Sequence, residues 1–256
     1  MKTFVILTDG IGNRFNHIYN FLHQIENVTF VWRRTTGWAR CLCRWDELFE
    51  YPTLDIIYNE FAPKTGKVVE FNHKDPNNLW AYYQHYDNIQ HNKLVKEFID
   101  KLVPTEEVAS LLYDLPKGTI GHSIRTCHPN SRIGRKPMIK IPDGDFLTSD
   151  TAWTRELNPN ALQIAGAKGA PYDFSIKRTA DTHLNLRNRQ GIISAIADWL
   201  MLFRCDAIHE YGLLPTPFQT LEHSTFLDSH KIYGKRVINM THKYDVGKEP
   251  WEGNSL

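Results

Sequence analysis

The chain has 256 residues, which is enough for one large domain or two small ones. Hydrophobic residues make up 41% of it and charged residues 23%, so the composition is globular and argues against global disorder. Lys and Arg number 30 against 29 Asp and Glu, and this net charge of +1 argues against a protein that mainly coats nucleic acid or anionic lipid.

The first half of the chain alternates strand and helix patterns. Residues 2–8 are a short apolar run typical of a buried parallel strand, and a glycine-rich turn follows at 9–13. Apolar residues then recur every three or four positions, which predicts a helix over 14–24. The other expected elements are strands at 29–32 and 54–58 and helices at 45–49, 92–102 and 105–112. This order predicts an α/β domain over residues 1–115.

The second half repeats the same alternation. A Leu-Pro-Lys-Gly break at 115–118 interrupts the pattern and places the domain boundary there. Strands are expected at 119–124, 145–149, 162–165 and 206–209, with a strongly apolar helix at 191–204 and another helix that begins at Thr216. The sequence therefore predicts a second α/β domain over residues 116–256.

Three short motifs follow strands in a way that suits an anionic ligand. The run Asp9-Gly10-Ile11-Gly12-Asn13 lets the backbone approach a ligand at a helix N-terminus. Arg125 ends an apolar strand, and its donor fork matches phosphate oxygens. Thr216-Pro217-Phe218-Gln219 forms a capping box after strand 206–209, at the sheet edge where ligands bind. Taken singly, each motif also has an ordinary structural explanation. These are, in order, a tight turn, a surface arginine and a capped helix.

One further motif suggests a metal. Asp143-Gly144-Asp145 has the spacing of an Asp-x-Asp pair that holds Mg²⁺ or Mn²⁺ against a diphosphate. Pro142-Asp143-Gly144 is also a strong turn sequence, and we favour the turn. The 12 histidines are not arranged at ligand spacing, so no metal site is assigned.

In order and rough spacing, the motifs resemble the fucosyltransferase superfamily with a GT-B-like fold. This superfamily includes nodulation and core α-1,6-fucosyltransferases and protein O-fucosyltransferases. Gly10-Ile11-Gly12-Asn13-Arg14-Phe15 looks like its G-x-G-N-[QR] loop. The other matching segments are 104–125, Phe146 to Asp150, Asp198 to Asp206, and Thr216 to Phe218.

The resemblance implies a compact GT-B-like α/β fold in which two Rossmann-like halves face a central cleft. Residues 1–115 are then the acceptor side, and residues 116–256 the nucleotide-sugar donor side. The implied reaction is inverting, metal-independent transfer of a sugar, with fucose from GDP-fucose as the expected case, to a glycan or other hydroxyl acceptor. No cofactor is expected besides the nucleotide-sugar donor.

The resemblance also implies roles for individual residues. Arg125 and Asn13 are the expected catalytic residues, with Arg125 at the diphosphate. The expected donor-binding residues are Gly10, Gly12, Arg14, Ser123, Ser149, Asp150, Asp206, Thr216 and Phe218. The catalytic base is left open among Asp9, Glu60, Asp150 and the histidines.

The chain departs from the family at three motifs, and 256 residues are few for two full domains. Ser123 stands where the family usually has His, Thr126, Cys127 and His128 stand where it has an acidic residue, and Thr216-Pro217 replaces its Ser-Ser pair. Two alternatives stay open: a metal-dependent transferase that uses Asp143 and Asp145, and a non-catalytic carbohydrate-binding protein of the same fold. Apolar runs are short and four cysteines form no disulfide framework, so we expect a cytoplasmic protein without a membrane span.

Overall fold

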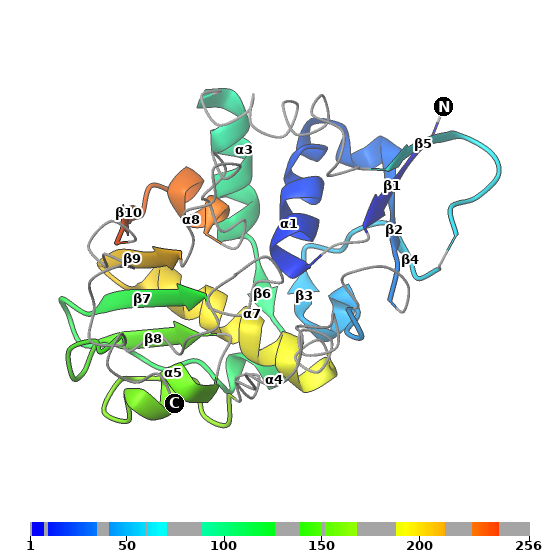
Figure 1. Ribbon diagram of the computed structural model, residues 1–256. Helices are drawn as coiled ribbons and strands as arrows, with labels where there is room; N and C mark the ends of the chain where they lie inside the picture. Colours follow the sequence, from blue (N-terminus) through cyan, green and yellow to red (C-terminus); the bar gives the residue numbers. More distant parts are fainter. Residues whose placement is uncertain are drawn as a thin grey trace, which may run out of the picture. The chain divides into compact units, whose positions relative to one another are not determined.

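The computed structural model describes residues 2–7, 10–34, 41–59, 61–70, 89–125, 139–149, 152–167, 188–212 and 227–240. Its chain divides into two units, each with a parallel sheet of its own (Figure 1). Unit 1 comprises Met1–Ser110, Arg187–Ile193 and Thr225–Gly234. Unit 2 comprises Leu111–Leu186, Ser194–Ser224 and Lys235–Leu256.

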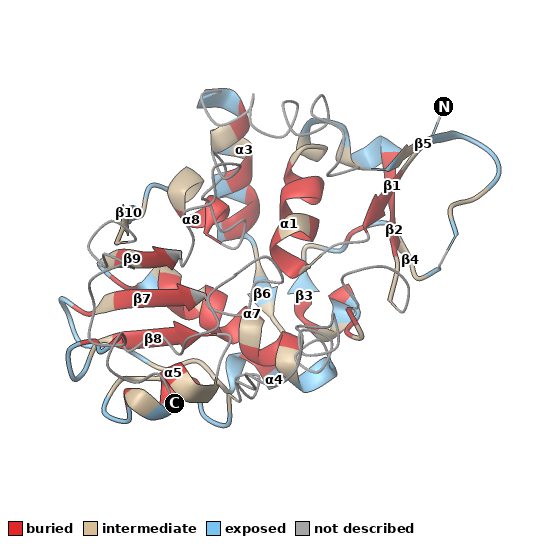
Figure 2. Cartoon of the chain, viewed as in Figure 1, coloured by how far each residue is buried: buried red, intermediate tan, exposed pale blue. Residues whose placement is uncertain are grey.

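The sheet of unit 1 has the order β4-β2-β1-β5, and all its strand pairs are parallel. Its strands are β1 (Thr3–Leu7), β2 (Val28–Trp32), β4 (Ile56–Ile57) and β5 (Lys67–Glu70). Every residue of β2 is buried, which is typical of a parallel strand covered on both faces (Figure 2). Apolar side chains therefore fill the centre of this sheet.

Helices and an antiparallel ribbon complete unit 1. The helical elements are α1 (Ile11–Tyr19), η1 (Leu22–Asn27), η2 (Trp45–Glu47), α3 (Ile89–Asp100), α4 (Glu106–Ala109) and α8 (Asp228–Tyr233). The ribbon pairs β3 (Phe49–Tyr51) with β6 (Val103–Pro104). Aromatic rings join these parts, because Phe15 lies 6.1 Å from both Trp45 and Phe49 between ring centroids.

The sheet of unit 2 has the order β10-β9-β7-β8 and is also parallel throughout. Its strands are β7 (Ile120–Arg125), β8 (Phe146–Ser149), β9 (Ala207–Gly212) and β10 (Arg236–Asn239). Its helical elements are α5 (Ala152–Leu157) and part of α7 (Arg189–Arg204). An added Cβ at Gly121 would lie 2.6 Å from Leu202 Cδ2, so this glycine lets α7 pack directly on β7.

The predicted α/β class with parallel sheets is confirmed, and the expected strands at 2–8, 29–32, 119–124 and 145–149 match β1, β2, β7 and β8. The predicted helix at 14–24 begins earlier, at Ile11, and ends at Tyr19. Residues 162–165 form no strand, since Leu162 makes only an isolated bridge to Phe146. The predicted helix at Thr216 lies outside the described residues.

The two units are not simply the two halves of the chain. The first division falls between Ser110 and Leu111, where the sequence places it between residues 115 and 116. Two later segments return to unit 1 because their side chains bond there. Arg189 pairs with Glu47 and Glu107, and Asp228 accepts a 2.8 Å hydrogen bond from Asn16.

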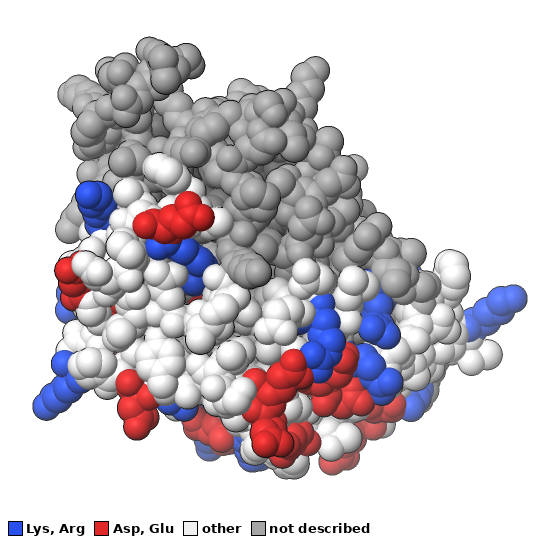
Figure 3. Space-filling view, turned by 90° about the horizontal axis from the view of Figure 1, so that it is seen from below, with Lys and Arg blue, Asp and Glu red and all other residues white. Residues whose placement is uncertain are grey.

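The described surface carries charges of both signs. Acidic and basic side chains lie next to one another on the face drawn in Figure 3. None of the helices in the described parts combines the length and the apolar character that a membrane crossing requires.

Candidate functional site

The carboxyl ends of β7, β8 and β9 form one edge of the unit 2 sheet. After β7 the chain continues to β8 on one side and later to β9 on the other, so the strand order reverses at β7. Open parallel sheets bind ligands at the carboxyl edge beside such a reversal. The register pairs Arg125 with Gly212 and Ile124 with Ser149. Arg125 and Ser149 therefore end neighbouring strands at the edge where a ligand is expected.

Polar side chains are buried just behind this edge. Ser123 pairs in register with Thr148 on one side and with Glu210 on the other. Their exposed fractions are only 7%, 7% and 4%. Burial of polar groups is costly unless they are hydrogen-bonded or used. The predicted donor residues Ser123 and Ser149 thus belong to a polar region of the sheet.

Asp198 is a further candidate for this site, and the sequence predictions did not name it as a site residue. It lies on α7, is 4% exposed, and its Oδ2 accepts hydrogen bonds from Thr148 Oγ1 (3.0 Å) and Arg155 Nη2 (2.8 Å). Its Oδ1 is buried and has no hydrogen-bond partner within the described part of the chain. Burial raises the pKa of the Asp198 carboxyl, and the Arg155 guanidinium acts against that rise. An orphan buried acceptor of this kind can receive a donor from a ligand.

A sequence signal for Asp198 existed. It is the one charged residue between Gly191 and Phe203, in a stretch that is otherwise strongly apolar. A carboxylate is seldom buried in a helix of this kind without a partner or a function.

The carboxyl end of β1 forms the corresponding edge in unit 1. Strand order reverses between β1 and β5, and the chain leaves β1 toward Gly10, the N-cap of α1. Gly10 has φ −59° and ψ 161°, which any residue adopts, and an added Cβ there would meet no described atom within 4 Å. Among the described residues, neither backbone conformation nor packing requires a glycine here, and the predicted ligand contact of Gly10 stays a prediction. Gly12 and Asn13 follow in the first turn of α1.

Arg14 differs from the other residues of this motif. Its side chain is fully buried, its Nη2 donates to the Arg33 carbonyl oxygen at 2.8 Å, and its guanidinium carbon lies 4.6 Å from the Trp32 ring centroid. This side chain is a core contact of unit 1. Its predicted role in donor binding stays a prediction.

Asp206 lies at the other edge of the unit 2 sheet. It precedes β9, and its backbone N–H donates to Thr119 O at 3.0 Å. Because Ile120 pairs with Ala207, Asp206 stands at the amino ends of the strands. Thr119, which lies at that level, precedes Arg125 by six residues of extended chain, a distance of roughly 20 Å. The structure does not bring Asp206 together with Arg125.

The Asp143-Gly144-Asp145 motif is also at the amino edge, where β8 begins. Gly144 has φ +82°, and the Asp145 N–H donates to Pro142 O at 3.3 Å, as in a turn. Asp145 Oδ1 accepts from the Ile120 N–H at 3.0 Å, and Asp145 Oδ2 lies 3.0 Å from His122 Nε2. Turn geometry and strand contacts therefore occupy these groups, and the described residues contain no cluster of three or more metal-ligand side chains.

Some predicted residues cannot be placed. Asp9, Glu60, Asp150, Thr216 and Phe218 lie outside the described residues. Arg125 is placed by its backbone alone. Their predicted roles stay predictions.

No protein-family model matches the chain, and no curated protein sequence matches it. Its structure is similar to the crystal structure of NodZ alpha-1,6-fucosyltransferase soaked with GDP-fucose, with a TM-score of 0.47 and 14% identity over 93% of this chain and 95% of that one. It is also similar to fucosyltransferase NodZ from Bradyrhizobium, with a TM-score of 0.46 and 13% identity over 96% of this chain and 97% of that one.

Proposed function

We propose that this chain is a glycosyltransferase that binds a nucleotide-sugar donor at the carboxyl edge of the unit 2 sheet and moves the sugar to a hydroxyl acceptor. The observation that carries the proposal is the placement of Arg125 and Ser149 at the ends of adjacent parallel strands, beside the reversal in strand order. The segments that resemble the fucosyltransferase superfamily end on these same strands, which supports sugar transfer as the reaction.

The chemistry of transfer explains why an arginine is needed there. When the bond between sugar and diphosphate breaks, negative charge grows on the leaving phosphate while the sugar becomes oxocarbenium-like. A guanidinium stays charged at every physiological pH and donates two parallel hydrogen bonds to phosphate oxygens. Arg125 in this role stabilises the charge that develops in the transition state. A fixed cation of this kind makes the reaction metal-independent, and a single displacement by the acceptor inverts the sugar.

Asp198 suits the base of the nucleotide. Its unpartnered Oδ1 is a buried acceptor beside Thr148 on β8. Guanine presents N–H donors that such an oxygen can accept, so a GDP-linked donor fits this position, with GDP-fucose as the expected case. Gly10, Gly12 and Asn13 are assigned to substrate contact at the N-terminus of α1, whose first N–H groups have no side-chain cap.

A panel of nucleotide sugars tests the proposal. Each compound is added to the protein in a thermal-unfolding assay, because a ligand that binds only the native state raises apparent stability, by about 2.7 kcal/mol at 100 times Kd. GDP-fucose is expected to give the largest shift, followed by release of GDP when a glycan acceptor is supplied. A chain that no nucleotide sugar stabilises at millimolar concentration is not this enzyme. Binding without turnover on any acceptor would instead favour the carbohydrate-binding alternative.

A further inference from the structure

A buried arginine lies beneath the carboxyl end of β8. Arg155 belongs to α5, the short helix that follows β8, and it is only 9% exposed. Each of its three guanidinium nitrogens donates to a partner. Nε donates to the Ser149 carbonyl oxygen at 3.0 Å, Nη1 to Gln163 Oε1 at 3.4 Å and Nη2 to Asp198 Oδ2 at 2.8 Å.

These contacts define what Arg155 can do. Because each guanidinium nitrogen already donates a hydrogen bond and the side chain is buried, we do not expect Arg155 to bind a phosphate directly. Its bonds join the last residue of β8 to the carboxylate on α7, and Thr148 Oγ1 reaches the same carboxylate oxygen. Arg155, Thr148, Ser149 and Asp198 form one network at the edge that receives the donor.

The network leaves one oxygen of Asp198 available. Both strong donors converge on Oδ2, while Oδ1 is buried without a partner in the described part of the chain. A buried ion pair is often no more stabilising than a well-packed apolar pair, so stability alone gives little reason to keep one. A carboxyl group that is held through one oxygen, while its other oxygen has no partner in the described part of the chain, is arranged as a ligand contact.

We infer that Arg155 is a positioning residue for donor binding: it holds the Asp198 carboxylate and the carboxyl end of β8 in the geometry that receives the nucleotide, without touching the nucleotide itself. The inference rests on the proposed function. It assigns to donor affinity a residue that lies outside the motifs shared with the superfamily.

Three variants test this role in graded steps. Arg155→Met removes the guanidinium, Arg155→Lys keeps the charge but cannot reach three acceptors, and Thr148→Val removes only the hydroxyl bond to Asp198. The probe is GDP, titrated by calorimetry, followed by steady-state transfer with GDP-fucose. We expect Kd for GDP and KM for the donor to rise about tenfold or more in Arg155→Met, less in Arg155→Lys and least in Thr148→Val. KM for the acceptor is expected to stay unchanged.

A matched control is available in the same unit. Arg204 is a half-exposed arginine at the end of α7, and its Nη1 donates to Tyr113 O at 2.8 Å. Arg204→Met should leave Kd for GDP at the wild-type value. This control separates loss of a positioned guanidinium from general loss of positive charge.

The outcomes are distinguishable. A wild-type protein that binds no nucleotide overturns the proposed function, and this inference with it. A wild-type protein that binds GDP, together with folded Arg155 variants that bind it equally well, overturns this inference alone. If Arg155→Met does not fold, Arg155→Lys and Thr148→Val decide, and unchanged donor affinity in both rejects the positioning role.

Discussion

The two parallel sheets share an architecture but differ in what fills them. The central strand β2 of unit 1 is buried over its whole length and holds four apolar residues and one threonine. The strands of unit 2 bury polar side chains as well: His122 and Ser123 on β7, Thr148 on β8 and Glu210 on β9. Buried apolar side chains stabilise the fold without a desolvation penalty. Buried polar side chains carry that penalty and are retained where a site needs them.

Two buried arginines sharpen the same contrast. Arg14 in unit 1 lies over the Trp32 ring and donates to a backbone carbonyl oxygen. Arg155 in unit 2 pairs with Asp198 and leaves one carboxylate oxygen open. The first arginine packs a core, and the second organises a polar edge.

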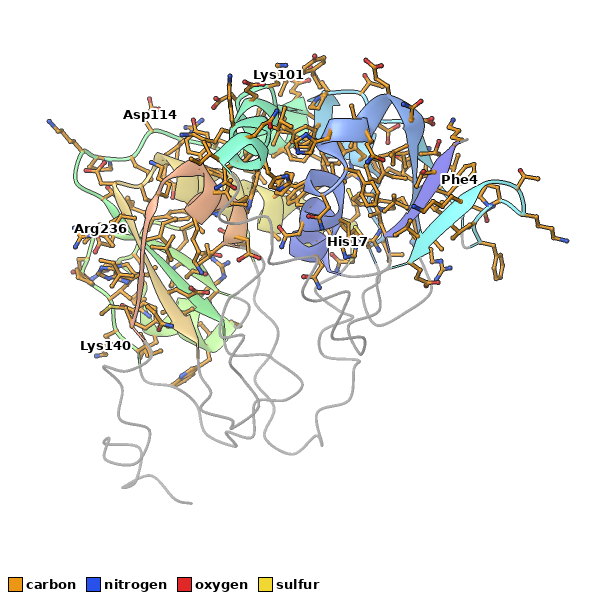
Figure 4. The ribbon with its side chains drawn as sticks, turned by 90° about the horizontal axis from the view of Figure 1, so that it is seen from above. Phe4, His17, Lys101, Asp114, Lys140 and Arg236 are labelled. Atoms are coloured by element: carbon orange, nitrogen blue, oxygen red, sulfur yellow. The ribbon has the colours of Figure 1, made fainter. Side chains whose placement is uncertain are left out.

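The largest expected effect comes from Arg125. Replacement by alanine removes the donor proposed to stabilise the leaving diphosphate, and loss of one such donor costs about 10² to 10³ in kcat. Arg236→Ala is the matched control, because Arg236 (labelled in Figure 4) is an exposed arginine at the amino end of β10 in the same sheet. Near-normal transfer by Arg125→Ala would remove the unit 2 edge from the mechanism.

Substitution of Gly121 and of Gly10 distinguishes a glycine required by packing from one that packing does not require. Gly121→Ala forces a Cβ to 2.6 Å from Leu202 Cδ2, and such overpacking should lower the free energy of unfolding by about 1 to 3 kcal/mol. Gly10→Ala should leave it unchanged or raise it by up to about 1 kcal/mol, because its backbone angles suit alanine. Urea unfolding of both variants makes the measurement. Equal destabilisation by the two would contradict the assignment of Gly10 to ligand approach.

Asp145 distinguishes a turn from a metal site. Asp145→Asn weakens contacts with Ile120 and His122, so we expect about 1 kcal/mol of lost stability and unchanged turnover, with or without EDTA. Abolition of transfer by EDTA and by Asp145→Asn alike would establish the metal-dependent alternative.

The smallest effect is the pH dependence from His122. Burial lowers the pKa of His122, although the hydrogen bond with Asp145 opposes this. The unfolded chain therefore binds a proton near pH 6.5 that the folded chain does not, so this contribution to stability is present above that pH and is lost as the pH falls. His122→Gln should flatten the fall in unfolding free energy between pH 7 and pH 5, measured by urea titration. An unchanged slope would show that His122 titrates alike in both states.

The central strands of both sheets could be predicted because their apolar runs are the direct consequence of burial on two faces. β5 and β10 were missed because they are edge strands without a buried residue, so they lack the apolar run of a strand that is covered on both faces. The helix after β1 was placed too late, since Gly10 and Gly12 suggested a turn where Gly12 is already helical. The local pattern thus identified most of the helices and strands, but not the edge strands β5 and β10 and not every end.

The sequence predicted the part of the candidate site that lies at strand ends. It did not predict the part that depends on contacts between residues far apart in the sequence. Arg125 and Ser149 end their strands, and the parallel register brings those ends together. The burial of Arg14 depends on Trp32, and the Arg155–Asp198 pair joins residues 43 positions apart. No spacing rule along the chain encodes either contact. The separation of Asp206 from Arg125 depends on register, because a residue that precedes a parallel strand lies at the amino edge of the sheet.

Amide hydrogen exchange with and without GDP tests the central claim most directly, because it reports which sheet edge the nucleotide occupies. Saturating GDP should slow exchange in the carboxyl-terminal residues of β7, β8 and β9, and more than in the strands of the unit 1 sheet. In Arg125→Ala this protection should be lost, and in Arg236→Ala it should be retained. Protection confined to unit 1, or no protection anywhere at saturating GDP, would contradict a donor site at the carboxyl edge of unit 2.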